Sequence, residues 1–100
     1  MSEVRKKILE EDITFYEKTK TLCLNVPGLE IRLTKDHVEA ILGVMDGNLK
    51  SAQCNLLFST VTFSRSSQIK NILEVDVPQV GGSPNHYFIE DKVLIKVLGI

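Results

Sequence analysis

The chain has 100 residues, of which 43% are hydrophobic and 25% are charged, a composition typical of one compact domain and too small for two cores. Lysine and arginine (12) nearly balance aspartate and glutamate (13), so the summed charge neither attracts nor repels phosphate strongly. Affinity for nucleic acid comes largely from neutralising phosphates, and this balance therefore counts against RNA as the main ligand. We expect a single domain over residues 1–100.

The two cysteines indicate a reducing compartment. Cys23 and Cys54 lie far apart, belong to no CxxC pair and lack the Cys and His spacing that a zinc site needs. We therefore expect two buried, reduced thiols and no metal site. No apolar run reaches the roughly eighteen residues that a membrane-spanning helix requires. The cytoplasm fits best, with the nucleus as a second location, and no membrane association is expected.

The first segment, residues 2–16, predicts an amphipathic N-terminal helix. Its apolar residues recur at helical spacing between charged residues: Val4, Ile8, Leu9 and Ile13. Ser2 can serve as the N-cap. One side of this helix, with Val4, Ile8 and Phe15, either caps the core or docks on a partner, and capping is favoured because small domains need every apolar contact.

Residues 19–33 predict two strands, KTLCLNV and LEIRL, divided by the turn signal Pro27–Gly28, or one strand with a bulged loop. The next segment, residues 34–48, supports two interpretations. Its apolar residues sit at i, i+3, i+4 and i+7, as in an amphipathic helix capped by Thr34, yet they also alternate as in a strand, and a glycine at position 43 disfavours a helix interior. Periodicity alone slightly favours the helix.

The second half of the chain predicts further strands. Residues 54–63 are rich in β-branched and aromatic side chains, and residues 69–77 alternate apolar and polar from Ile72 onward, so both predict strands. The proline- and glycine-containing segment 78–85 predicts a loop. Residues 87–89 and 93–98 read as the last two strands. The final one is apolar on both faces, which suggests that it pairs with another chain. Its candidate interface residues are Val93, Ile95 and Val97.

One helix and about five short strands make the expected fold mainly β, and a small barrel suits them because it leaves few free edges. The order of a front helix, IRLTKDHVEAILGVMD (Ile31–Asp46), QCNLLF (Gln53–Phe58) and YFIEDKVLIKV (Tyr87–Val97) resembles the Sm and Sm-like (LSm) proteins. The resemblance implies a five-stranded Sm-like barrel over about residues 19–98, preceded by the helix at 2–16.

The motifs that carry this resemblance also depart from it. Asp46 and Asn55 match the polar pair of the first Sm motif, but more residues separate them than the tight turn of the family allows. Glu90 and Asp91 stand where RNA-binding members carry Arg-Gly, and carboxylates repel phosphate and cannot stack on a base. The resemblance therefore implies a vestigial RNA pocket at these four positions, and direct RNA binding is not expected.

Sm-like proteins without the RNA pocket are similar to assembly subunits. The phrases IRLTKDH and AQCNLLF resemble strands of the Sm-like auxiliary subunit of the NatC N-terminal acetyltransferase. The Sm-like Gemin proteins of the SMN complex, which act in snRNP assembly, are the alternative. Either resemblance implies a non-catalytic scaffold whose strand edges and N-terminal helix bind other protein subunits, the β-augmentation mode of interaction.

No residue pattern predicts catalysis or a cofactor site. His37 lies between charged neighbours and reads as a surface histidine, and His86 has no nucleophile or carboxylate placed beside it by any motif. Two other hypotheses stay open: an Sm-like RNA-binding protein, and a small α+β protein with a helix at Lys35 to Met45, such as a phage or toxin-related module.

Overall fold

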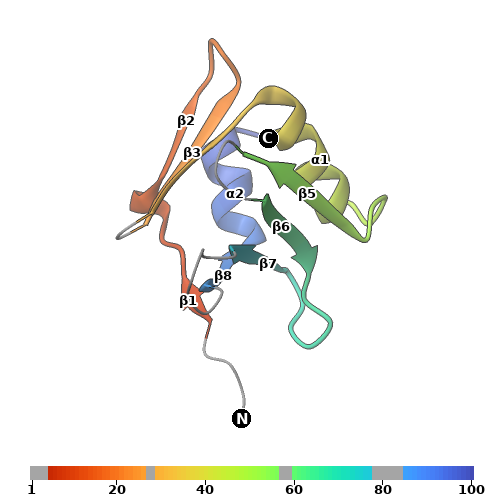
Figure 1. The fold of residues 1–100 in the computed structure, drawn as a ribbon. Helices are drawn as coiled ribbons and strands as arrows, with labels where there is room; N and C mark the ends of the chain where they lie inside the picture. Colours follow the sequence, from red (N-terminus) through yellow and green to blue (C-terminus); the bar gives the residue numbers. More distant parts are fainter. Residues whose placement is uncertain (1–4, 27–28, 57–59, 78–84) are drawn as a thin grey trace.

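The computed structural model describes residues 5–26, 29–56, 60–77 and 85–100, and shows a mainly β protein in which two sheets and two helices share one hydrophobic core (Figure 1). The elements are β1 (Lys6–Lys7), the 3-10 turn η1 (Glu10–Asp12), β2 (Ile13–Tyr16), β3 (Thr21–Val26), β4 (Leu29–Leu33), α1 (Lys35–Met45), β5 (Ser51–Asn55), β6 (Thr60–Arg65), β7 (Ile72–Val77), β8 (Asn85–Glu90) and α2 (Asp91–Leu98).

The larger sheet has five strands in the order β1-β8-β7-β6-β5, and the smaller has three in the order β2-β3-β4. Strands β5 to β8 form an antiparallel meander, whereas β1 joins β8 in parallel, with Lys6 opposite Tyr87. Helix α2 lies between the β2–β3 hairpin and the larger sheet (Figure 1). Neither sheet closes on itself, so the predicted five-stranded closed barrel is wrong, although the mainly β class is confirmed.

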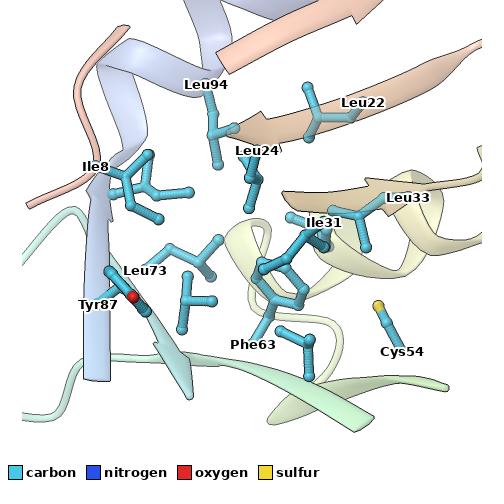
Figure 2. Close-up of a cluster of buried hydrophobic side chains, with 14 of the residues drawn as sticks. Ile8, Leu22, Leu24, Ile31, Leu33, Cys54, Phe63, Leu73, Tyr87 and Leu94 are labelled. Atoms are coloured by element: carbon cyan, nitrogen blue, oxygen red, sulfur yellow. The ribbon is translucent and has the colours of Figure 1, made fainter. Parts of the chain in front are cut away.

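The core lies between the two sheets and the helices, because the meander strands alternate strictly between a buried and a solvent-facing side. In β7, for example, Leu73, Val75 and Val77 are buried while the residues between them are half-buried. Side chains from both sheets and α2 meet around Phe63 (Figure 2). Helix α1 adds its own apolar stripe of Val38, Ile41 and Val44.

The predicted N-terminal helix over residues 2–16 is wrong. From residue 5 onward the segment forms β1, one 3-10 turn and β2, and Ile13 pairs with Leu24 of β3. Ile8 and Ile13 both reach the core, one on each side of the 3-10 turn. The segment ITFY also has a high strand propensity. Ile8 is buried and is not a free docking surface, whereas Phe15 is half-buried and packs only partly against the core; Val4 lies outside the described residues.

The ambiguous central segment forms α1, as the slight excess of helical periodicity indicated. Thr34 precedes the first turn, and its backbone N–H donates to Nδ1 of His37 at 3.3 Å, which gives that histidine a capping role. Gly43 is tolerated inside the helix because the chain folds back over it: a Cβ built there would lie 3.0 Å from Cδ1 of Leu49.

The predicted last strand, residues 93–98, is also wrong, because Asp91–Leu98 is helix α2. Short apolar runs do not distinguish a buried strand from a helix, and the chain chooses the helix here with Leu94 buried and Gly99 ending it at φ 72°. Val93 and Val97 pack against the core, and Ile95 is 42% exposed. These three residues therefore form no strand edge.

The predicted strand at residues 54–63 is divided into β5 and β6, which pair antiparallel with Asn55 opposite Thr60. Residues 57–59 of that prediction lie outside the described residues. The strands predicted within 19–33, at 69–77 and at 87–89 are confirmed by β3, β4, β7 and β8. The result is a continuous four-strand meander.

Candidate functional site

Of the four positions of the predicted vestigial RNA pocket, Asp46, Glu90 and Asp91 lie near one another and Asn55 lies apart. Asp46 ends α1, Glu90 ends β8 and Asp91 begins α2. Asn55 ends β5, where its side-chain oxygen accepts a hydrogen bond from the hydroxyl of Thr60 at 3.0 Å. Arg65, at the other end of β6, lies five residues from Thr60, about 16 Å along the strand, and Arg65 contacts Asp91. Asn55 is therefore at the opposite end of the hairpin from Asp91.

Asp91 has a structural role instead. Its two carboxylate oxygens lie 2.8 and 2.6 Å from Nη1 of Arg65, and Nη2 of the same arginine donates to the carbonyl of Met45 at 2.9 Å. Asp91 is the one charged residue that is buried among the described residues. Arg65 thus joins the last carbonyls of α1 to the first turn of α2.

Sequence analysis missed this arginine. Arg65 follows Val61 and Phe63 at the inward-facing positions of β6, and a charged residue in that alternation is the signal that could have marked it. Its partner could not be found that way, because the carboxylate belongs to a helix that the sequence presents as a strand.

A second charged cluster lies on the solvent-facing side of the larger sheet. Nη1 of Arg5 lies 2.9 Å from Oδ1 of Asp76 and donates to the carbonyl of Tyr87, while Nη2 lies 3.4 Å from Glu74. Nδ1 of His86 lies 2.6 Å from the same oxygen of Asp76. The histidine and the arginine share this carboxylate, so the cluster ties the N-terminal segment to β7 and β8.

This face is not basic. Glu90 bridges Lys7 at 2.7 Å and Lys92 at 3.2 Å, and these contacts hold the pKa of its carboxyl below the ordinary value. Together with Glu74 and Asp76 it places three carboxylates on the sheet. Arg5, Lys7 and Lys92 pair with these carboxylates, so the cluster offers no net positive charge to a phosphate backbone, which is unfavourable for nucleic-acid binding.

The pKa of Asp76 leads to a prediction of pH dependence. Burial alone would raise this pKa, but the hydrogen bonds from His86 and Arg5 and the charge of Arg5 outweigh it and hold the pKa below its ordinary value. A lowered carboxyl pKa stabilises the folded state above the unfolded pKa of about 4, and this contribution is lost as the pH falls through the folded value. The stability difference between the wild type and Asp76→Asn is therefore expected to shrink from pH 6 toward pH 2.5.

Urea midpoints measured at several pH values test this expectation. Asp36→Asn, which alters an exposed carboxyl in the first turn of α1, serves as the control. A wild-type advantage over Asp76→Asn that stays constant across this range would contradict the proposed linkage.

The edges of the two sheets differ in charge. The outer edge strand β1 has two residues, both lysine, and the edge strand β4 carries Glu30 and Arg32 at its exposed positions. Such charges discourage pairing with another chain. Strand β5 carries none: Ser51, Gln53 and Asn55 are exposed, and the two residues between them are buried. Edge strand β2 has no charge either; η1 precedes it directly and α2 packs against it, while α1 packs against β5.

The prediction of two buried, unpaired thiols is confirmed, since Cys23 and Cys54 are both free and buried. Burial raises the pKa of Cys54 to about 11. No group of three or more potential metal ligands occurs among the described residues.

Cys54 is therefore expected to resist modification. At pH 8 only about one Cys54 thiol in a thousand is ionised in the folded state, because the thiolate fraction falls tenfold for each unit of pKa. In a Cys23→Ser variant, a disulfide reagent at pH 8 is expected to react at least about 100-fold more slowly with the folded protein than with the urea-unfolded protein. Equal rates in the two states would show that the β5 edge opens faster than the reagent attacks.

No protein-family model, no curated protein sequence and no solved structure matches this chain. Within residues 5–26, 29–56, 60–77 and 85–100, no helix is long and apolar enough to cross a membrane.

Proposed function

We propose that this protein is a non-catalytic subunit of a multi-protein complex, and that it binds a partner by adding an extended segment of that partner to strand β5. The observation that carries the proposal is that β5 ends the five-stranded sheet, pairs with β6 alone in that sheet and carries no charged residue. An edge strand presents unpaired backbone N–H and C=O groups on its free side, and an incoming strand satisfies them.

The pattern of β5 also favours an ordered strand addition. Ala52 and Cys54 face the core, and Ser51, Gln53 and Asn55 face solvent. A partner strand paired in register would extend both faces of the sheet. Its apolar residues would lie next to Ala52 and Cys54, and its polar residues next to the exposed residues of β5. A segment of five or more residues that alternates apolar and polar side chains is the partner chemistry that fits.

The finer assignment to an Sm-like subunit of the NatC or SMN type stays a prediction, since it rests on the sequence resemblance alone. The open sheets differ from the barrel which that resemblance implies. Direct RNA binding is the second function that the resemblance leaves open. The three carboxylates on the exposed sheet face, Glu74, Asp76 and Glu90, disfavour it.

The experiment is affinity purification from the native source, identification of the co-eluting proteins, and reconstitution of the complex. Hydrogen exchange of the reconstituted complex is expected to protect the β5 amides relative to the free protein. The double variant Ser51→Lys/Gln53→Lys places two charges on the edge and is expected to weaken binding at least tenfold.

The sheet register supplies a matched control. Ser64 and Thr62 of β6 lie directly opposite Ser51 and Gln53 on the same face, but β6 is an internal strand. The double variant Thr62→Lys/Ser64→Lys is therefore expected to retain the partner. If both double variants lose it, the partner binds the face and not the edge. Binding that neither pair alters, or recovery of RNA alone, would overturn the proposal.

A further inference from the structure

A groove of about 220 Å³ lies where the turn between β2 and β3, the first turns of α1 and the end of α2 meet. In Figure 1 this is the end of the molecule where the C-terminus lies beside α1. Five apolar residues line the groove: Phe15, Val38, Leu42, Leu98 and Ile100. Three charged residues complete it: Lys20, Lys35 and Glu39.

The apolar lining is only partly shielded by the protein itself. Phe15, Leu42 and Leu98 are half-buried against the core, and Ile100 is 66% exposed. An alkyl chain laid against these side chains would remove apolar surface from water on both partners, which is favourable in proportion to the area covered.

The two lysines stand at positions where local structure disfavours them. Lys20 has φ 57°, in the left-handed region that glycine and asparagine adopt more readily. Lys35 is the first residue of α1, where the helix dipole favours an anion and opposes a cation. Sequences break local rules of this kind chiefly where function requires it.

The charges at the groove favour an anion. Neither lysine forms an ion pair or a hydrogen bond with any other side chain in the described part of the chain. Two cations and the N-terminal end of α1 outweigh the single carboxylate of Glu39. The groove thus combines five apolar residues with two lysines whose ammonium groups no described acidic side chain pairs.

We propose that this groove binds a free medium-chain carboxylate, whose alkyl chain lies on Phe15, Leu42 and Leu98 and whose carboxylate lies between Lys20 and Lys35. The length follows from the volume. A water molecule occupies about 30 Å³ and a methylene group about as much, so the groove holds about seven or eight of them. Octanoate is therefore the best-fitting probe. This site is separate from the β5 edge and does not depend on the proposed strand addition.

Titration of the ¹⁵N-labelled protein with hexanoate, octanoate and decanoate, followed by NMR, tests the proposal. Saturable shifts are expected at the amides around the groove. Affinity should rise about twofold to fourfold for each methylene up to octanoate and then level off, because further carbons extend beyond the groove. Octan-1-ol, which has the same chain without the charge, is expected to bind about threefold to fivefold more weakly.

Two variants separate the charge from the apolar floor. Lys20→Gly/Lys35→Gln removes both cations at positions that accept the new residues, and should lower octanoate affinity about fivefold while leaving octan-1-ol unaffected. Leu42→Asp should lower the affinity for both probes. The control Lys6→Gln/Lys50→Gln removes the same charge from exposed sites outside the groove.

An equal loss of octanoate affinity in the control would show that binding depends on net charge and would overturn the proposed site. Shifts that do not saturate, or that spread over the surface with no dependence on chain length, would also overturn it. A shift map centred on the groove with the expected loss in the lysine variant supports it.

Discussion

Replacing Asp91 with alanine is expected to lower the free energy of unfolding by about 2–4 kcal/mol. Removing one partner of a buried ion pair leaves the other charge without compensation, which costs about 3–5 kcal/mol when both are fully buried. The Arg65 side chain is 35% exposed, so water can solvate part of its charge and the loss falls at the lower end. The carbonyl of Met45 keeps its hydrogen bond only if the arginine stays in place.

Urea unfolding of the purified variant measures this loss. Asp36→Ala is the matched control, because Asp36 also occupies the first turn of a helix but is exposed; its loss should stay within about 0.5–1 kcal/mol. If Asp91→Ala costs no more than Asp36→Ala, the Arg65–Asp91 pair contributes no more than an ordinary helix-terminal charge.

Replacing Phe63 with alanine is expected to cost about 3–5 kcal/mol, the range for deleting a fully buried aromatic side chain. Phe63 is 1% exposed and lies at the centre of the cluster that joins both sheets to α2 (Figure 2). The cavity left behind would be bordered by strands of the larger sheet and by β3 and β4, none of which can collapse into it without losing its pairing.

Phe88→Ala provides the comparison, because Phe88 is half-buried on the solvent-facing side of β8. Its truncation removes less buried surface and creates no enclosed cavity, so we expect a loss of about 1–2 kcal/mol. Thermal and urea unfolding of both variants give the two values. Similar losses for the two phenylalanines would mean that the core is loosely packed around Phe63.

The meander strands were predictable because each has one solvent-facing side. In β7, Leu73, Val75 and Val77 alternate with polar residues, and this period of two has no helical equivalent. The segment from Lys35 to Met45 supports both periods in the sequence. Tertiary packing selects the helix. The apolar stripe of α1 buries three side chains against both sheets, whereas a strand added to one sheet would not pack against both.

The two ends of the chain were mispredicted for opposite reasons. At the N-terminus, Leu9 and Ile13 are spaced like helix residues, but a 3-10 turn between two short strands leaves Leu9 exposed and brings Ile8 and Ile13 to the core. At the C-terminus, VLIKVL is apolar except for Lys96, and its pattern does not show that a helix begins at Asp91, where the carboxylate pairs with Arg65. Long-range contacts of this kind leave no periodic signal in the sequence.

The candidate surfaces were predictable only in part. The sequence pattern predicted a pairing edge at residues 93–98, which form helix α2 instead, and the edge that we propose for binding is that of β5. The groove was not predicted at all, because Phe15, Lys35 and Leu98 come together only through the packing of three elements.

The short strand β1 has a kinetic consequence. Arg5 and the carbonyl of Tyr87 that it contacts are 82 positions apart, so their meeting requires nearly the whole chain to close into a loop. Contacts offset the entropic cost of closing that loop only after β7 and β8 have paired. We therefore expect β1 to dock late in folding. By the same reasoning it should be the first part to detach, exposing Ile8 and the β8 edge while the meander remains folded.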